Sequence, residues 1–342
     1  MYDASVFVLL FFVAASIVLY VVLGGADYGA GIIELLPIRN SEIRRKQREI
    51  VNRAMGPVWE ANHMWLVIIV VILFMGFPVI FQNVMVSLHI PIVAVLIGIV
   101  ARGSVFTFRH YEVELTPTRA KAYTISFGLS SLWTSFWLGV TAGSLFRGLI
   151  STQSADFYTL YVAPWFGLFP LSLGFFTTSI FSFLAAIFLV GESQDIEMKK
   201  YFVARAWKTN LFVIGTGAVV FLSASIEGYE LMNNFFKNPL AVLAFILANI
   251  SFFVLWFKLQ KRRSFYTRLI AAAQVSFILI GWFAMHWPNA LKLDGIYLSF
   301  FNSTAPEPVL NQLIIALLLG SCFIFPSLFF LIRTFKMEKK ES

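Results

Sequence analysis

Long apolar stretches separated by short polar segments make up most of this chain. A run of roughly 20 apolar residues is long enough for a helix to cross a bilayer. In lipid such a run forms a helix, because a helix satisfies its own backbone hydrogen bonds. We therefore expect an all-α, polytopic integral membrane protein with one transmembrane domain over residues 1–342. The pattern predicts nine spans, near residues 5–35, 57–80, 84–104, 122–147, 163–190, 208–227, 239–258, 267–287 and 309–332.

Composition and loop lengths agree with a membrane protein. The chain has 342 residues, of which 59% are hydrophobic and 13% charged, outside the range of soluble domains. No connection is long enough for a soluble domain. Spans one to four and five to eight allow two four-helix units followed by a ninth helix. Prolines at or inside apolar runs predict kinks or helix ends at Pro78, Pro91, Pro170 and Pro326.

Basic residues predict the orientation, because Lys and Arg collect in cytoplasmic loops. Of the 26 basic residues, 23 follow spans one, three, five, seven and nine. Only Arg147, Lys237 and Lys292 fall on the other side. The N-terminus is therefore expected outside and the C-terminus in the cytoplasm. The net charge of +8 reflects this distribution and does not indicate nucleic-acid binding.

Two further features have simple expectations. Residues 1–5 carry Asp3 and no basic residue, and no small-residue cleavage pattern follows, so we expect the first span to remain in the mature chain. Cys322 is the one cysteine, so it cannot form an internal disulfide or a thiolate metal site.

Ionisable residues inside the first three spans are the candidate functional site, since charges at membrane depth are costly and usually handle ions or protons. The segment GPVWEANHMWL at 56–66 opens span two. By depth, we expect a polar cluster on the cytoplasmic side, within residues 1–110, that could relay protons. Its predicted members are Asp27, Glu60, His63 and Arg102, with Asn62 and Trp59 as hydrogen-bonding neighbours and Glu34 on the face of Asp27. In the alternative interpretation these acids only pair with arginines and stabilise packing.

Other chemistries have weaker support. Glu60 and His63 have the spacing of one Glu-x-x-His element of di-iron bundles, but a second element is missing, so we expect no metal site. The glycines of GGADYGAG at 24–31 follow no strand, and close helix packing around Gly25, Gly29 and Gly31 explains them better than a phosphate loop. Haem ligation between His89 and His286 is an alternative to ordinary hydrogen-bonded histidines.

Several motifs resemble those of subunit II of cytochrome bd-type quinol oxidases. They are GADYGAG at 25–31, GPVWEANHMWL at 56–66 and RGSVFTFRH at 102–110, followed in the same order by FGLFPLSLG at 166–174, HWPNALKL at 286–293 and YLSFFNSTAPEPVL at 297–310. Members of that family resemble this chain in having nine spans and an outside N-terminus. The resemblance covers most of the chain, and the second motif is the specific one.

The resemblance implies a complex with subunit I, which binds haems b and d, or b only, oxidises quinol at the outer face and reduces oxygen to water. This chain would carry no catalytic residue or haem, and would lie in a bacterial or archaeal plasma membrane. It would support its partner and line a proton path from the cytoplasm. Residues that match family positions are Asp27, Glu60, Asn62, Trp59, Trp65, Arg102 and Arg109. Some members hold a structural quinone, whose binding residues the sequence does not identify, and small single-helix subunits are further candidate partners.

Two positions depart from the family pattern. Gly24 stands where the family often has an acid, so the proton entrance is expected to differ, and Thr107 replaces a frequent acid, so Arg109 must pair elsewhere. Two alternative functions remain: a proton-coupled secondary transporter, which would work alone, and a purely structural scaffold subunit.

Overall fold

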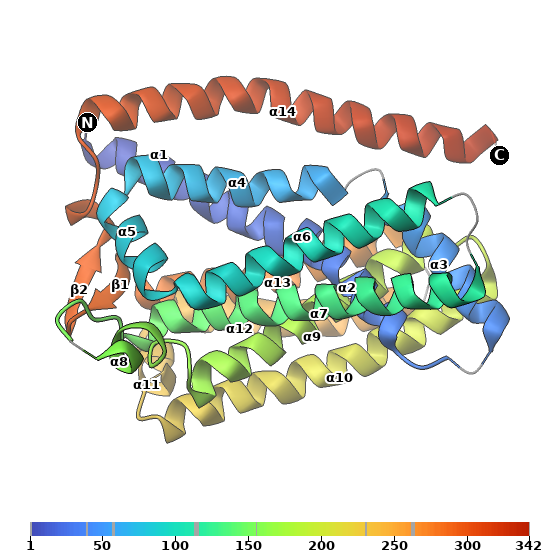
Figure 1. Cartoon of the computed structure of the whole chain (residues 1–342), viewed down its shortest axis with the longest axis horizontal. Helices are drawn as coiled ribbons and strands as arrows, with labels where there is room; N and C mark the ends of the chain where they lie inside the picture. Colours follow the sequence, from blue (N-terminus) through green and yellow to red (C-terminus); the bar gives the residue numbers. More distant parts are fainter. Residues whose placement is uncertain are drawn as a thin grey trace.

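The computed structural model describes residues 2–38, 40–56, 59–112, 116–154, 156–229, 231–260 and 264–341. The basic residues Arg39, Lys261, Arg262 and Arg263 and the motif residues Pro57 and Val58 lie outside the described residues. The structure is an all-α membrane protein with one small two-stranded hairpin, and its long helices run side by side (Figure 1). The hairpin lies at one end of the bundle, here called the hairpin end, and helix α3 lies at the other, the α3 end.

The first half of the chain forms helices that match the first four predicted spans. Span one is a continuous helix in three parts, with a short π-helical turn η1 between α1 and α2. The bounds are α1 (Tyr2–Leu19), η1 (Tyr20–Gly24), α2 (Gly25–Leu35), α3 (Ser41–Met55), α4 (Trp59–Gly76), α5 (Pro78–Ser87), α6 (His89–Tyr111) and α7 (Pro117–Arg147). The amphipathic helix α3 and the short helix α5 were not predicted.

The second half matches the remaining spans. Its bounds are α8 (Phe157–Tyr161), α9 (Leu168–Glu192), α10 (Ile196–Ile226), α11 (Leu231–Lys237), α12 (Pro239–Gln260), α13 (Ser264–His286), β1 (Asn289–Leu293), β2 (Ile296–Ser299), η2 (Phe300–Asn302) and α14 (Glu307–Glu341). Helix α10 begins well before the predicted start at 208, because Asp195 caps it by accepting a hydrogen bond from the Glu197 amide.

The prolines lie largely where helices begin. Pro78 starts α5, and Pro91 and Pro170 lie in the first turns of α6 and α9, where a missing amide hydrogen breaks no helical bond. Pro326 instead lies inside α14. Three of the four predicted proline positions are therefore at helix starts.

Eight helices in the described part of the chain are long and apolar enough to cross a membrane. The span predicted at 122–147 is not among them. Its helix α7 has 31 residues, but serines and threonines lower its hydropathy. These hydroxyls bond back to carbonyls one turn earlier, as Ser131 does to Phe127 and Ser135 to Ser131. The count of nine spans and the orientation remain predictions.

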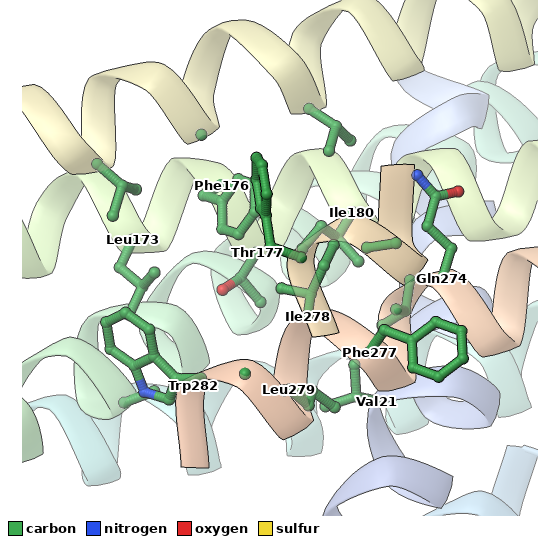
Figure 2. Close-up of a pocket in the computed structure, with 18 of the residues that line it drawn as sticks. Val21, Leu173, Phe176, Thr177, Ile180, Gln274, Phe277, Ile278, Leu279 and Trp282 are labelled. Carbon is green, nitrogen blue, oxygen red and sulfur yellow. The ribbon is translucent and has the colours of Figure 1, made fainter. Parts of the chain in front are cut away.

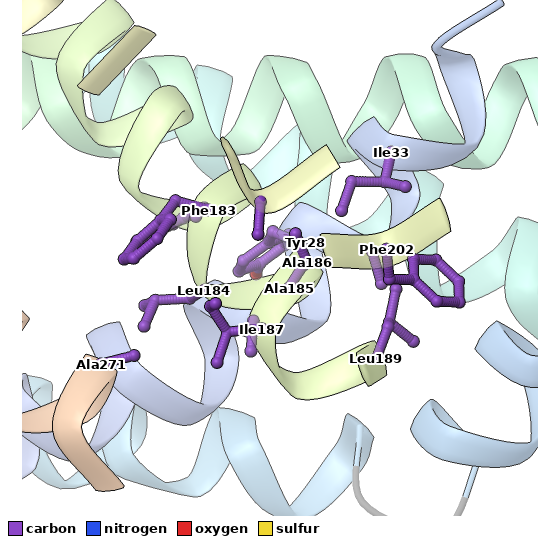
Figure 3. Close-up of a cluster of buried hydrophobic side chains, with 14 of the residues drawn as sticks. Tyr28, Ile33, Phe183, Leu184, Ala185, Ala186, Ile187, Leu189, Phe202 and Ala271 are labelled. Carbon is purple, nitrogen blue, oxygen red and sulfur yellow. The ribbon is translucent and has the colours of Figure 1, made fainter. Parts of the chain in front are cut away.

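Helix α9 is the centre of the bundle and α14 lies at its edge. In α9, 67% of the 18-residue apolar window is buried inside the protein, whereas in α14 the buried share is 6%. Helix α9 is largely apolar around its circumference, as expected for a helix that lies mostly inside the protein. Figure 3 shows side chains of α2, α9, α10 and α13 meeting in this core, with Leu184 and Ile187 fully buried.

Helix α2 packs between α7 and α9 with very little space, as the glycine pattern predicted. A Cβ atom at Gly29 would lie 1.8 Å from the carbonyl oxygen of Phe181, and one at Gly31 would lie 2.3 Å from Oγ of Ser131. The absence of side chains lets the backbones approach. Every residue from Gly25 to Glu34 is consequently buried.

At the hairpin end, an Asp-Gly turn joins β1 to β2. Asp294 and Gly295 both have positive φ angles, of 46° and 82°, as a two-residue hairpin turn requires. The Asp294 carboxylate accepts hydrogen bonds from the Ser151 hydroxyl at 2.5 Å and the Thr152 hydroxyl at 2.7 Å. The hairpin is therefore tied to the segment that follows α7.

We predict that Gly29→Ala destabilises the bundle, whereas Gly215→Ala does not. The added methyl at residue 29 must displace the α9 backbone, and overpacking of this kind costs about 1–3 kcal/mol or more. A methyl at Gly215 would contact nothing within 4 Å. Thermal unfolding in detergent measures both, and equal melting temperatures for the two variants would contradict the close approach.

The hydrogen bonds that tie Asp294 to Ser151 and Thr152 should weaken in acid. Hydrogen bonds from Ser151 and then Thr152 hold the pKa of Asp294 below its usual range. Since the folded-state pKa is the lower one, the stabilisation is complete above the unfolded pKa of about 4 and is lost as the pH falls through the folded value. Hydrogen exchange of residues 148–154 should rise there, and Asp294→Asn should show fast exchange at every pH. Asp3→Asn, which changes an exposed acid elsewhere, is the control. If hydrogen exchange in the native chain does not depend on pH, the carboxylate of Asp294 does not hold this segment.

Candidate functional site

Asp27 on α2 and Arg102 on α6 form an ion pair in the interior. Nη2 of Arg102 donates to Oδ1 of Asp27 at 2.6 Å. The side chains are 0% and 1% exposed for Asp27 and Arg102 respectively. A charge this deep is tolerated only when it is paired, so each residue requires the other.

The surroundings of Arg102 hold its guanidinium in one position. Its Nε donates to Oγ of Ser131 on α7 at 3.2 Å, and the group lies over the rings of Tyr28 and Phe127, 4.9 and 5.0 Å from their centres. The other oxygen of Asp27, Oδ2, is buried and has no hydrogen-bond partner among the described residues. Arg102 therefore engages one oxygen of the carboxylate and leaves the other without a partner in the described structure.

A second ion pair lies nearer the α3 end. Both terminal nitrogens of Arg109 donate to the Glu34 carboxylate, at 2.7 and 3.0 Å. Glu34 follows Asp27 by seven residues and Arg109 follows Arg102 by seven, so the pairs lie two turns apart along α2 and α6. Thr107 stands where the family often has an acid, so Arg109 was expected to pair elsewhere, and its partner is Glu34. Thr107 itself is exposed, and its hydroxyl donates to the Gly103 carbonyl.

A chain of hydrogen bonds runs beside the first pair. The hydroxyls of Tyr20 and Tyr28 are 3.1 Å apart, and the Tyr28 hydroxyl is 3.0 Å from Nε2 of His63. Nδ1 of His63 is 2.8 Å from the Trp59 carbonyl oxygen. Because a carbonyl only accepts, Nδ1 carries the proton in the neutral ring, and Nε2 accepts from Tyr28.

Our sequence analysis did not identify Tyr20, Tyr28 or Ser131. Tyr20 begins the π-helical turn η1, a feature common at functional sites. Tyrosines are frequent in membrane helices, so their presence was no signal. The one available signal was two tyrosines eight residues apart in a span that also carries Asp27.

The other predicted residues divide into two groups. Asn62 and Trp65 are buried: Asn62 donates to the Leu23 carbonyl at 3.4 Å, and the Trp65 ring lies 6.1 Å from that of Phe325 on α14. The Trp59 ring lies against Phe106 and His63.

Glu60, in contrast, does not join the predicted cluster. It is exposed and makes no hydrogen bond or ion pair with any residue that the structure describes. It precedes Asn62, on the buried face of α4, by two residues, which is about 200° around the helix. Glu60 therefore faces outward from this chain.

His89 and His286, which the sequence analysis considered as a pair of haem ligands, contact different aromatic residues. Nδ1 of His89 is 2.8 Å from the Val86 carbonyl oxygen, and its ring lies against Tyr161. Nδ1 of His286 is 2.9 Å from the Trp282 carbonyl oxygen, and its ring lies against Phe146. Each is hydrogen-bonded within its own segment.

An apolar cavity of about 690 Å³ lies beside the hydrogen-bond chain, between α9, α10, α12 and α13. Figure 2 shows its lining from α9 and α13, including Phe176, Gln274 and Trp282. Oε1 of Gln274 and Nδ2 of Asn210, both lining residues, are buried without partners in the described structure. Tyr20 also lines the cavity, so the hydrogen-bond chain reaches it.

Comparisons with known proteins identify the relatives of this chain. Residues 5–335 match the family described as Cytochrome bd terminal oxidase subunit II. The chain is 31% identical to the cytochrome bd ubiquinol oxidase subunit 2 of Bacillus subtilis (strain 168) over 156 residues, which span 44% of each protein. It is 22% identical to the putative cytochrome bd menaquinol oxidase subunit II of the same organism, covering 94% of this chain and 93% of that one.

Structural similarity covers the whole fold. The chain resembles a chain of the bd oxidase from Geobacillus thermodenitrificans with a TM-score of 0.77 and 18% identity, over 97% of this chain and 98% of that one. At this identity the likeness concerns the fold. The arrangement of spans is therefore shared with a solved oxidase chain.

We predict that Asp27→Asn destabilises the chain strongly, because it leaves the Arg102 charge buried and unpaired. Breaking a buried pair from one side costs about 3–5 kcal/mol. Glu49→Gln removes the exposed pair with Arg45 on α3 and should change little. Thermal unfolding of both variants checks this, and the double variant Asp27→Asn, Arg102→Gln should recover part of the loss. Unchanged stability in Asp27→Asn would show that Arg102 does not depend on the carboxylate.

Proposed function

This chain belongs to the family of cytochrome bd terminal oxidase subunit II, and we propose that it lines a proton path and supports the haem-bearing subunit I. It is a multi-pass plasma-membrane subunit of an oxidoreductase complex. We assign the haems, b and d or b only, and the oxidation of quinol and reduction of oxygen to the partner. In this assignment the present chain is not catalytic by itself.

The observation that carries the proton path is the free Oδ2 of Asp27. Oxygen reduction consumes protons, and a path through a membrane needs groups that accept and release them. Asp27 is fully buried in span one, one oxygen is held by Arg102, and the other has no hydrogen-bond partner among the described residues. A proton on Oδ2 would leave Oδ1 accepting from Arg102, but it would be held only transiently, because Arg102 needs the charge of the carboxylate.

The hydrogen-bonded hydroxyls and imidazole offer the next positions of the path. Tyr28 follows Asp27 in sequence, and its hydroxyl bonds to Nε2 of His63 on α4. Hydroxyl and imidazole groups both donate and accept, so a proton that arrives at one can leave from the other side. In our proposal the α3 end faces the cytoplasm, and Glu34 with Arg109 lies between that end and Asp27.

The exposed position of Glu60 supports a partner on this face of α4. Exposed apolar side chains continue from Glu60 along one stripe of the helix, at Val67, Val70, Val71 and Phe74. Lipid tails alone would leave a carboxylate at the end of this stripe without a polar neighbour. We propose that subunit I covers the stripe and that Glu60 passes protons to it.

The apolar cavity is suited to the structural quinone that some family members hold. Its walls are aliphatic and aromatic, as an isoprenoid chain requires. The unpartnered amides of Asn210 and Gln274 can donate to, or accept from, a quinone head group. Such a molecule would fill the space between α10 and α13, and Tyr20 would border it.

Glu60→Gln tests the relay. If Glu60 is an obligatory step, quinol-dependent oxygen uptake by the purified complex should fall, by up to about a hundredfold. The haem absorption spectrum should stay intact, because the side chain keeps its shape. Glu307→Gln, an exposed acid at the first turn of α14, is the matched control.

Two results would reject the relay. Normal oxygen uptake in Glu60→Gln would remove Glu60 from the path. Loss of the haem spectrum would indicate that Glu60 holds the subunits together, as a purely structural scaffold subunit requires.

A further inference from the structure

We propose that a second pocket, at the hairpin end, binds the phosphate-bearing head group of a membrane lipid. The pocket has a volume of about 520 Å³. Its lining comes from the ends of α7 and α13, from α11 and from β1. Figure 1 shows α11 and β1 at the hairpin end. It is separate from the Asp27 site and belongs to no step of the proposed proton path.

Two of the three basic residues that the sequence assigns to this side of the membrane line this one pocket. They are Arg147, the last residue of α7, and Lys292 on β1. Lys237, the third, is exposed on α11 and is not part of the lining. Because Lys and Arg are rare on this side, their convergence indicates a specific role.

The charge of the pocket comes from Lys292. Arg147 is neutralised by Glu227, whose Oε1 lies 3.2 Å from Nη2, and it also donates to the Phe166 carbonyl. Asp294 lies two residues after Lys292, but its carboxylate accepts from Ser151 and Thr152. Lys292 itself makes no ion pair with any described residue. Its ammonium lies 5.5 Å from the centre of the Tyr297 ring.

The same pocket carries further hydrogen-bond donors. The side-chain amides of Asn234 and Asn289 line the pocket, and no hydrogen bond of either is seen among the described residues. Together with Lys292 they offer several N–H groups in one concave space, which suits the acceptor oxygens of a phosphate. The hairpin holds Lys292 in place through its pairing with Tyr297.

The apolar part of the pocket distinguishes a lipid from a free anion. Phe146, Phe169 and Leu231 form one side, which a small inorganic anion would not use. Trp282 and Met285 line both this pocket and the apolar cavity, so the walls continue into the bundle. A phosphate at Lys292 attached to hydrocarbon chains fits both parts, because the ammonium attracts the anionic head group while the apolar walls take the chains.

Native mass spectrometry of the purified complex, titrated with phosphatidylglycerol, tests the site. Lys292→Gln should weaken phosphatidylglycerol binding about fivefold, which corresponds to about 1 kcal/mol for one basic residue at a membrane surface. Lys292→Arg should retain it, and Lys237→Gln should bind as the native complex does. Asn234→Ala is a second pocket variant that removes a donor without changing the charge, and it should also weaken binding.

Three outcomes would overturn the proposal. One is equal phosphatidylglycerol binding in Lys292→Gln and the native complex. Another is an equal loss in Lys237→Gln, which would indicate general surface charge. The third is displacement of the lipid by millimolar inorganic phosphate together with Lys292-dependent binding of that phosphate alone, which would identify a free-anion site. The haem spectrum and melting temperature of each variant confirm that the complex is folded.

Discussion

The close approach of α2 to α9 at Gly29 is the constraint on which the rest of this structure depends. With the Phe181 carbonyl 1.8 Å from where a Cβ atom would lie, only glycine permits this spacing. The contact encloses α2 completely, including Asp27 and Glu34. Since neither acid reaches water or lipid, each must find its counter-charge inside the protein, and both find it on α6.

The two ion pairs form a line of charged residues between α2 and α6, inside a bundle whose core is mostly apolar. We call this line the polar seam. Both pairs join residues 75 positions apart, so the helices run side by side in the same direction. The Tyr20, Tyr28 and His63 chain extends this seam to α4 on one side. On the other side Tyr20 borders the large cavity. The candidate groups therefore lie next to one another, although they come from helices far apart in sequence.

How far the site was predictable depended on the residue type. Asp27, Glu34 and Arg102 were identified because a charge in an apolar span is conspicuous, and Arg109 was identified through the family resemblance. The structure pairs the four residues two by two. Glu60 was expected in the same cluster, but it lies on the exposed side of α4, because the sequence does not show how that helix is rotated.

Tyr20 and Tyr28 were missed for a different physical reason. Tyrosine is common at the ends of membrane spans and carries no charge at neutral pH, so the pair did not stand out, and only the structure shows the π-helical turn that begins at Tyr20. The end of span two shows the opposite case. The apolar run continues past Phe77 without interruption, but Pro78 predicted a kink or helix end there, and the chain turns at this point into α5.

By itself the sequence determined the class of the protein, the positions of most of its long helices and the charges that they carry, because backbone groups in lipid must bond within a helix and buried charges are rare. The tertiary structure decided which of those charges meet, which acid faces outward and where cavities remain. These depend on how each helix is rotated against its neighbours, and that rotation is set by contacts such as Gly29 on Phe181, between residues more than a hundred positions apart.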